Sequence, residues 1–119
     1  MKRFEDLEVY KKAFALAISV YKLTNSKSFD LNIKNQIQRA ALSIPLNIAE
    51  GFELQSNKQF IKFLYISKAS SGELRSLLRI CEELNFIDKI IVDDLLNETE
   101  DVSKQLSKFI SYLKNSKIE

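Results

Sequence analysis

Histidine and tryptophan are absent from this sequence of 119 residues, and cysteine occurs once. Without an imidazole, the chain cannot build a Ser-His-Asp triad, a Glu-x-x-His di-iron site or most zinc sites. The single cysteine, Cys81, excludes an intrachain disulfide and fits a reducing compartment, where we expect it to be a small core residue. We therefore expect no catalytic site, no cofactor and no bound metal.

Two glycines and one proline leave little material for turns, which argues against a fold with many strands. No apolar run approaches the ~18 residues that a membrane span needs. The N-terminal segment turns acidic at Glu5 and Asp6, before any run that could serve as a signal peptide. These features predict one cytoplasmic domain over residues 1–119, with a few long helices, no membrane association and no small-molecule substrate.

Apolar residues recur at helical spacing in four long segments. The first, from about Asp6 to Lys27, has two neighbouring apolar rows, which is more than a bundle helix needs. The second begins with Asp30 as its N-cap, and its apolar register continues through Pro45, where the missing N–H should kink it. The rows of the first segment are Leu7, Tyr10, Phe14, Ala17, Ile18 and Tyr21, and Val9, Ala13, Leu16, Val20 and Leu23.

The third segment opens with a capping box over residues 56–59 and contains the small cluster Ala69-Ser70-Ser71-Gly72, which we expect to let another backbone approach closely. The fourth follows Asp88, a possible N-cap, and has a regular seam from Val92 to Leu113. The four segments predict an all-α fold, an up-and-down antiparallel four-helix bundle whose second helix is kinked at the proline.

Charge is distributed unevenly along the chain. Residues 1–79 hold thirteen Lys and Arg against seven Asp and Glu, a net charge of +6, whereas residues 80–119 hold five against nine, a net charge of −4. A basic surface on the first two helices could follow phosphates. Alternatively, these helices could meet the acidic fourth helix, within a subunit or between copies. The candidate phosphate contacts are Lys11, Lys12, Lys22, Lys34 and Arg39.

A polar ridge on the second segment, from Gln36 to Glu50, interrupts a surface that is otherwise apolar on more than one side. Arg39 and Glu50 would be costly to bury unpaired, so each should find a partner charge or reach solvent. Together with the wide apolar arcs of the first two helices, this ridge is typical of a subunit interface. We therefore expect a homo-oligomer.

Two acidic pairs could in principle hold magnesium, as in helical nucleotide pyrophosphohydrolases. Glu50 and Glu53 straddle the expected helix end at Gly51, and Glu98 and Asp101 lie on the polar side of an amphipathic helix. A solvated acidic face explains both pairs better than a metal site does. A magnesium-dependent nucleotide hydrolase is therefore the least favoured hypothesis.

The segment RAALSIPLNIAEG, residues 39–51, closely resembles the signature of a four-helix-bundle family encoded by intervening sequences within bacterial 23S ribosomal RNA genes. Residues 4–10, 60–69 and 71–74 also match in order and spacing. Members are often called ribosomal proteins because of where their genes lie. Under this resemblance, the motif residues with a structural or interface role are Arg39, Ser43, Pro45, Asn47, Glu50 and Gly51.

The resemblance implies the bundle fold, a ring-like homo-oligomer, specifically a pentamer, and no enzymatic activity. The chain is also similar to the accessory proteins of diversity-generating retroelements, which are basic pentameric barrels that work with a reverse transcriptase and nucleic acid. We therefore expect a non-enzymatic homo-oligomer that binds structured RNA or a nucleic-acid enzyme through the basic face of its first two helices. The alternative is a protein-binding scaffold with no nucleic-acid role.

Overall fold

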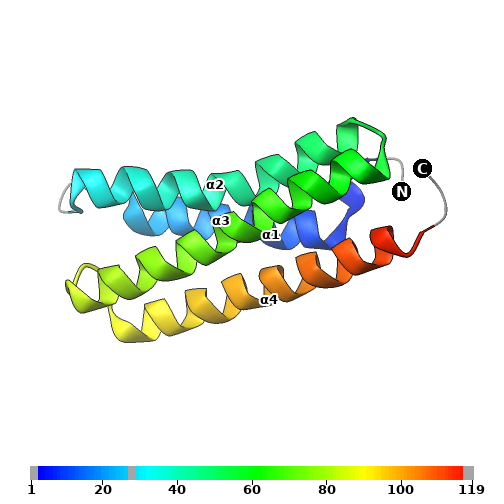
Figure 1. Cartoon of the computed structure of the whole chain (residues 1–119). Coiled ribbons are helices and arrows are strands. Elements are labelled where there is room, and N and C mark those ends of the chain that lie inside the picture. The colour runs from blue at the N-terminus through cyan, green and yellow to red at the C-terminus, as the bar shows by residue number, and fades with distance from the viewer. Residues whose placement is uncertain (1–2, 27–28, 117–119) are drawn as a thin grey trace.

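The computed structural model describes residues 3–26 and 29–116, which form a short 3₁₀ turn and four α-helices (Figure 1). The helices run alternately up and down, and α1 and α3 each contact both α2 and α4. This arrangement confirms the predicted all-α, up-and-down four-helix bundle. The elements are η1 (Phe4–Asp6), α1 (Glu8–Thr24), α2 (Leu31–Glu53), α3 (Asn57–Glu83) and α4 (Lys89–Lys114).

Each helix contributes to one core that runs along the bundle, which measures 49 × 20 × 20 Å. Leu16 of α1, Ile44 of α2, Leu74 of α3 and Leu106 of α4 are all fully buried. Cys81 is buried with them, as the sequence predicts, and burial raises the pKa of its thiol. The thiol is therefore a packing group in this fold.

The predicted N-caps are confirmed for α2 and α3. Asp30 Oδ1 accepts a hydrogen bond from the backbone N–H of Ile33 at 2.9 Å, and Ser56 Oγ accepts one from Gln59 at 3.4 Å. Asp88 occupies the N-cap position of α4, but its carboxylate makes no cap hydrogen bond. These side chains set where α2 and α3 begin.

The first helix is shorter than the sequence predicts. It begins at Glu8 after the 3₁₀ turn and ends at Thr24, whereas the expected end, Lys27, lies outside the described residues. Thr24 Oγ1 donates to the Val20 carbonyl at 2.7 Å and accepts a bond from Gln38 Nε2 at 2.9 Å. This buried pair fixes the end of α1 against α2.

The second helix continues through Pro45, and its C-terminal half is inclined to its N-terminal half (Figure 1). Proline has no N–H to donate to the Ala41 carbonyl, and its ring crowds that carbonyl, which accounts for the bend. One residue before the proline, the Ile44 carbonyl accepts a hydrogen bond from Ser67 Oγ of α3 at 2.7 Å. The predicted kink is therefore present, and a hydrogen bond from α3 holds the helix next to it.

The two glycines have different surroundings. A Cβ added to Gly51 would lie 2.6 Å from Phe63 Cβ, which is closer than real Cβ atoms come. A Cβ added to Gly72 would meet nothing within 4 Å. The predicted close approach along residues 69–72 is thus wrong for Gly72. The tightest glycine contact between α2 and α3 lies at Gly51 instead.

Candidate functional site

An exposed apolar stripe runs along the side of α1 that borders α2. Phe14, Ile18 and Tyr21 are spaced four and three residues apart, and their side chains are 50%, 42% and 37% exposed. The core side of the helix is formed by the other predicted row together with Ala17. On α2, Leu42 and Leu46 continue the stripe, and Leu46 is 61% exposed. We call these five side chains the α1–α2 apolar surface.

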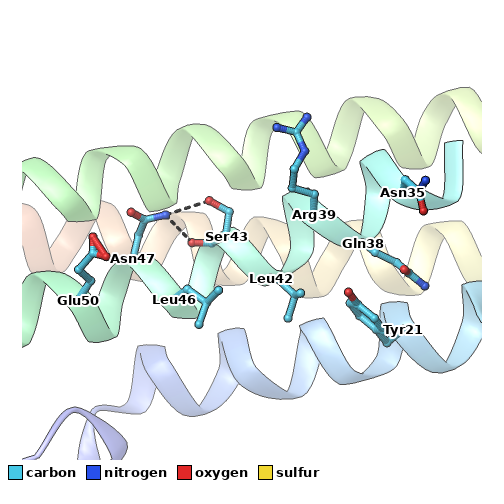
Figure 2. Close-up of a pocket in the computed structure, with 9 residues that line it drawn as sticks. All are labelled: Tyr21, Asn35, Gln38, Arg39, Leu42, Ser43, Leu46, Asn47 and Glu50. Carbon is cyan, nitrogen blue, oxygen red and sulfur yellow. Dashed lines mark hydrogen bonds between the residues drawn. The ribbon is translucent and has the colours of Figure 1, made fainter. Parts of the chain in front are cut away.

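A shallow groove of about 420 Å³ lies where the stripe passes from α1 to α2. Figure 2 shows Leu42 and Leu46 pointing toward α1, while Arg39 points toward α3. Except for Tyr21, every lining residue belongs to α2. The lining comprises Tyr21, Asn35, Gln38, Arg39, Leu42, Ser43, Leu46, Asn47 and Glu50.

Two motif residues in this groove are held by hydrogen bonds. Asn47 Nδ2 donates to the Ser43 carbonyl at 2.8 Å and to Ser43 Oγ at 2.9 Å, both drawn in Figure 2. Ser43 Oγ also accepts a bond from Ser70 Oγ of α3 at 2.8 Å. Ser43 therefore connects α2 to α3, Asn47 holds Ser43 from within α2, and the buried Gly51 lies against Phe63 of α3.

The charged motif residues remain available to a partner. Arg39 Nη2 lies 3.7 Å from Glu73 Oε2, but the arginine side chain is 74% exposed, so this ion pair adds little to stability. Glu50 is exposed and has no ion pair among the described residues. Both charges reach solvent, as predicted, and they lie on either side of Leu46 along α2.

Lys12 is directed away from the groove and faces α4. Its Nζ lies 2.6 Å from Asp101 Oδ2, and this hydrogen bond is the main cause that lowers the pKa of Asp101. For Lys12, the alternative interpretation therefore holds: this lysine of a basic helix pairs with the acidic fourth helix of the same subunit.

The other four basic candidates do not form one continuous face. Lys11 and Lys22 project into solvent from the outer side of α1, and Lys11 lies 3.8 Å from Glu8. Lys34 is half-buried on α2, and Arg39 turns toward α3. Of the five predicted phosphate contacts, Lys11 and Lys22 are the two that project into solvent from the same side of α1, about three helical turns apart.

The two acidic pairs lie on helices that are diagonal in the bundle. Glu50 and Glu53 are on α2, whereas Glu98 and Asp101 are on α4, and α2 and α4 do not contact each other in the described structure. Across residues 3–26 and 29–116, no three Asp, Glu or Cys residues are grouped so that they could hold a metal ion. The fold thus does not bring together the two carboxylate pairs on which the hypothesis of a magnesium-dependent hydrolase depends.

Residues 5–108 match the family model described as 23S rRNA-intervening sequence protein. The chain belongs to this family. The match confirms the resemblance drawn from residues 39–51. The match does not test the expected similarity to the retroelement accessory proteins, which stays a prediction.

A similar solved structure has the same fold as this family member. It is the crystal structure of a protein of unknown function from the S23 ribosomal protein family of Bacteroides thetaiotaomicron VPI-5482. Its TM-score is 0.80 at 25% identity, with 86% of this chain and 97% of that chain covered. No curated protein matches the chain. Within its described part, this 23S rRNA-intervening sequence protein has no helix long and apolar enough to cross a membrane.

Sequence reasoning missed a second group of cations in this family member. It assigned the basic surface to α1 and α2, guided by the charge count over residues 1–79. Two segments that are far apart in sequence, residues 57–72 and 102–116, each contain three lysines and no Asp or Glu. The absence of acidic residues from both segments was visible in the sequence, but only the fold shows that the two segments lie side by side.

Proposed function

We propose that this 23S rRNA-intervening sequence protein is a cytoplasmic, non-enzymatic homo-oligomer that binds structured RNA or an enzyme acting on nucleic acid. The observation that carries the proposal is the α1–α2 apolar surface. Folding of one chain leaves Phe14, Ile18, Tyr21 and Leu46 substantially in water. Contiguous apolar surface of this kind marks interaction sites in proteins that do not span membranes.

Self-assembly through this surface has a favourable driving force and a source of specificity. Each Å² of apolar surface removed from water contributes about 25 cal/mol. Arg39 and Glu50 carry opposite charges on either side of Leu46, so a neighbouring copy could be oriented by charge pairs at the edge of the contact. In the ring of five that the family resemblance implies, this surface would meet a different surface of the next subunit.

The nucleic-acid part of the proposal is supported by Lys11 and Lys22. They lie eleven residues apart, a separation of about 16 Å along α1, and both project into solvent. In an oligomer assembled through α1 and α2, copies of these lysines would border each subunit contact. Repeated around a ring, they would give salt-sensitive phosphate binding with little sequence specificity.

Light scattering tests the assembly. We expect the wild-type protein to have a mass that is a multiple of 13.8 kDa. Because the changed side chains are exposed, F14S/I18S should fold with unchanged helicity and be monomeric. The control I66S/I90S removes two exposed isoleucines from α3 and α4 and should remain oligomeric. A wild-type protein that is monomeric at all concentrations would refute the assembly.

Binding to labelled ribosomal RNA fragments across a salt series tests the second part. We expect an intact oligomer to bind, with affinity falling steeply as salt rises. The variant K11A/K22A should weaken binding and reduce the salt slope by about 1.4 to 1.8 if each subunit loses two phosphate contacts. If both affinity and slope are unchanged, the α1 lysines do not contact RNA.

A protein-binding scaffold is the second candidate, because part of the basic surface is already matched by carboxylates. Lys12 contacts Asp101, and Arg39 contacts Glu73. An intact oligomer that retains no RNA even at low salt would favour this candidate. The next experiment would then be the search for a protein partner.

A further inference from the structure

A cationic surface lies where the first half of α3 packs beside the last half of α4. The two helices are antiparallel, and Lys114 of α4 reaches Tyr65 of α3: its Nζ donates to the tyrosine oxygen at 2.6 Å and lies 5.0 Å from the ring centroid. We call the six lysines of these two halves the α3–α4 lysine surface. They are Lys58, Lys62, Lys68, Lys104, Lys108 and Lys114.

No carboxylate forms an ion pair with these lysines in the described residues, although Lys104 contributes to the lowered pKa of Asp101, three residues before it. Among the described residues, none of the six has an Asp or Glu oxygen within 4 Å. The other halves of the same two helices and their connection, residues 73–101, hold nine acidic and three basic residues. Cationic and acidic groups on this side of the bundle are therefore separated along its long axis. Glu8 of α1 lines the same hollow as Lys108 of α4, and Glu53 is the last residue of α2.

Two tyrosines on the same helix halves are exposed, and Lys114 lies over one face of the Tyr65 ring. Tyr65 is 45% exposed and Tyr112 is 69% exposed. A hollow of about 290 Å³ beside Tyr65 is lined by Lys58, Gln59, Ile61, Lys62 and Tyr65. Lysines that follow a phosphate backbone, next to aromatic faces on which bases stack, are the combination found in proteins that bind single-stranded nucleic acid.

We infer that the α3–α4 lysine surface is a second nucleic-acid site, which binds single-stranded or looped RNA by its phosphates while bases stack on Tyr65 and Tyr112. Fifteen helical residues extend for about 22 Å, long enough for a strand of several nucleotides. The site goes beyond the proposed function, because it lies on α3 and α4 and does not use the α1 lysines. The α1–α2 apolar surface lies on a different side of the subunit from this site.

The test compares two variants with the same loss of charge. K58A/K62A/K108A removes three lysines of the site and leaves the contact between Lys114 and Tyr65 intact. The control R75A/R79A/K89A removes three cations from the acidic halves of α3 and α4. Binding of a fluorescein-labelled 20-nucleotide oligouridylate is measured by anisotropy at several salt concentrations, with light scattering on the same samples.

We expect the lysine variant to bind at least tenfold more weakly, with a salt slope reduced by about 2, since each phosphate contact to a single strand contributes about 0.7. The control should retain both values. Y65L/Y112L should lower affinity about tenfold or more and keep the salt slope, because stacking does not depend on counterion release.

Four results would overturn the inference. Equal losses in the two triple variants would mean that only net charge matters, and no binding by the wild-type protein at low salt would remove the site altogether. Polyglutamate that competes as well as unlabelled oligouridylate would identify an acidic protein segment as the partner. If K11A/K22A abolishes binding while K58A/K62A/K108A does not, the inference fails and the proposed function stands.

Discussion

Alanine at the two glycines should change stability in opposite directions. Both positions are helical with negative φ, so neither glycine is needed for its backbone conformation. At Gly51, however, the new methyl group would lie 2.6 Å from Phe63 Cβ and 3.0 Å from Phe60 Cδ1. At Gly72 it would enter open space. The substitution is chemically the same, and only the surroundings differ.

The expected changes in the free energy of unfolding follow from these distances. Overpacking costs about 1 to 3 kcal/mol, and alanine in place of glycine inside a helix returns up to about 1 kcal/mol. We therefore expect Gly51→Ala to lower the free energy of unfolding by about 1 to 2 kcal/mol. Gly72→Ala should raise it by about 0.5 to 1 kcal/mol, because only the helix propensity term remains. The two variants should therefore differ by about 1.5 to 3 kcal/mol.

Thermal and urea unfolding, followed by circular dichroism at one protein concentration, measures the difference. For a chain of this size, 1 kcal/mol corresponds to about 4 °C in Tm, so the variants should be separated by about 6 to 12 °C. The concentration must be fixed because self-association would itself stabilise the protein. If Gly51→Ala were as stable as the wild type, the close approach of α2 and α3 would not require glycine. A destabilised Gly72→Ala would mean that this position is covered.

Three further predictions concern individual side chains. Thr24→Val removes the buried acceptor of Gln38 Nε2 and should cost about 1 to 3 kcal/mol in urea unfolding; Thr24→Ser should stay within 1 kcal/mol of the wild type, and equal losses would show that the hydroxyl is unimportant. Lys12→Met should return the lowered pKa of Asp101 toward its ordinary value, measured by NMR of the carboxyl carbon. The lowered pKa of Asp101 stabilises the fold above about pH 4, and this stabilisation is lost as the pH falls through the pKa of the folded state. The stability deficit of Lys12→Met should therefore shrink in acid. A deficit that does not change with pH would show that the pair with Asp101 is not its cause. Burial raises the pKa of Cys81, so Ellman's reagent should label it only on unfolding; labelling of the native protein as fast as in urea would contradict its burial.

Helix positions could be predicted because local signals agreed with the tertiary fold. Asp30 and Ser56 cap α2 and α3, and the apolar register correctly indicated that α2 continues through Pro45. The sequence distinguished the two glycines wrongly: it predicted a helix end at Gly51, whereas α2 continues to Glu53, and it predicted the close approach at Gly72. Which of them contacts another helix depends on the side of the helix on which it falls, and only Gly51 faces an aromatic side chain on α3.

The candidate surface was predictable in part. Two apolar rows on the first helix indicated more hydrophobic surface than one bundle can cover, and the structure leaves Phe14, Ile18 and Tyr21 outside. The basic face was harder to predict, because a charge count along the chain ignores direction. Lys12 and Arg39 turn toward neighbouring helices, whereas Lys62 and Lys108, which are far apart in sequence, belong to helix halves that the fold brings to one end.

The separation of charge between the two halves of α3 and α4 has a consequence for how this molecule meets a polyanion. A rigid rod with opposite charges at its two ends is turned by an external field, so the lysine-rich end swings toward the anion before any contact forms. The turning acts over about one Debye length, which is about 10 Å at 0.1 M salt and about 30 Å at 0.01 M. The rate of encounter should therefore fall with added salt, whereas the contribution of stacking on Tyr65 and Tyr112 to the bound state should not depend on salt.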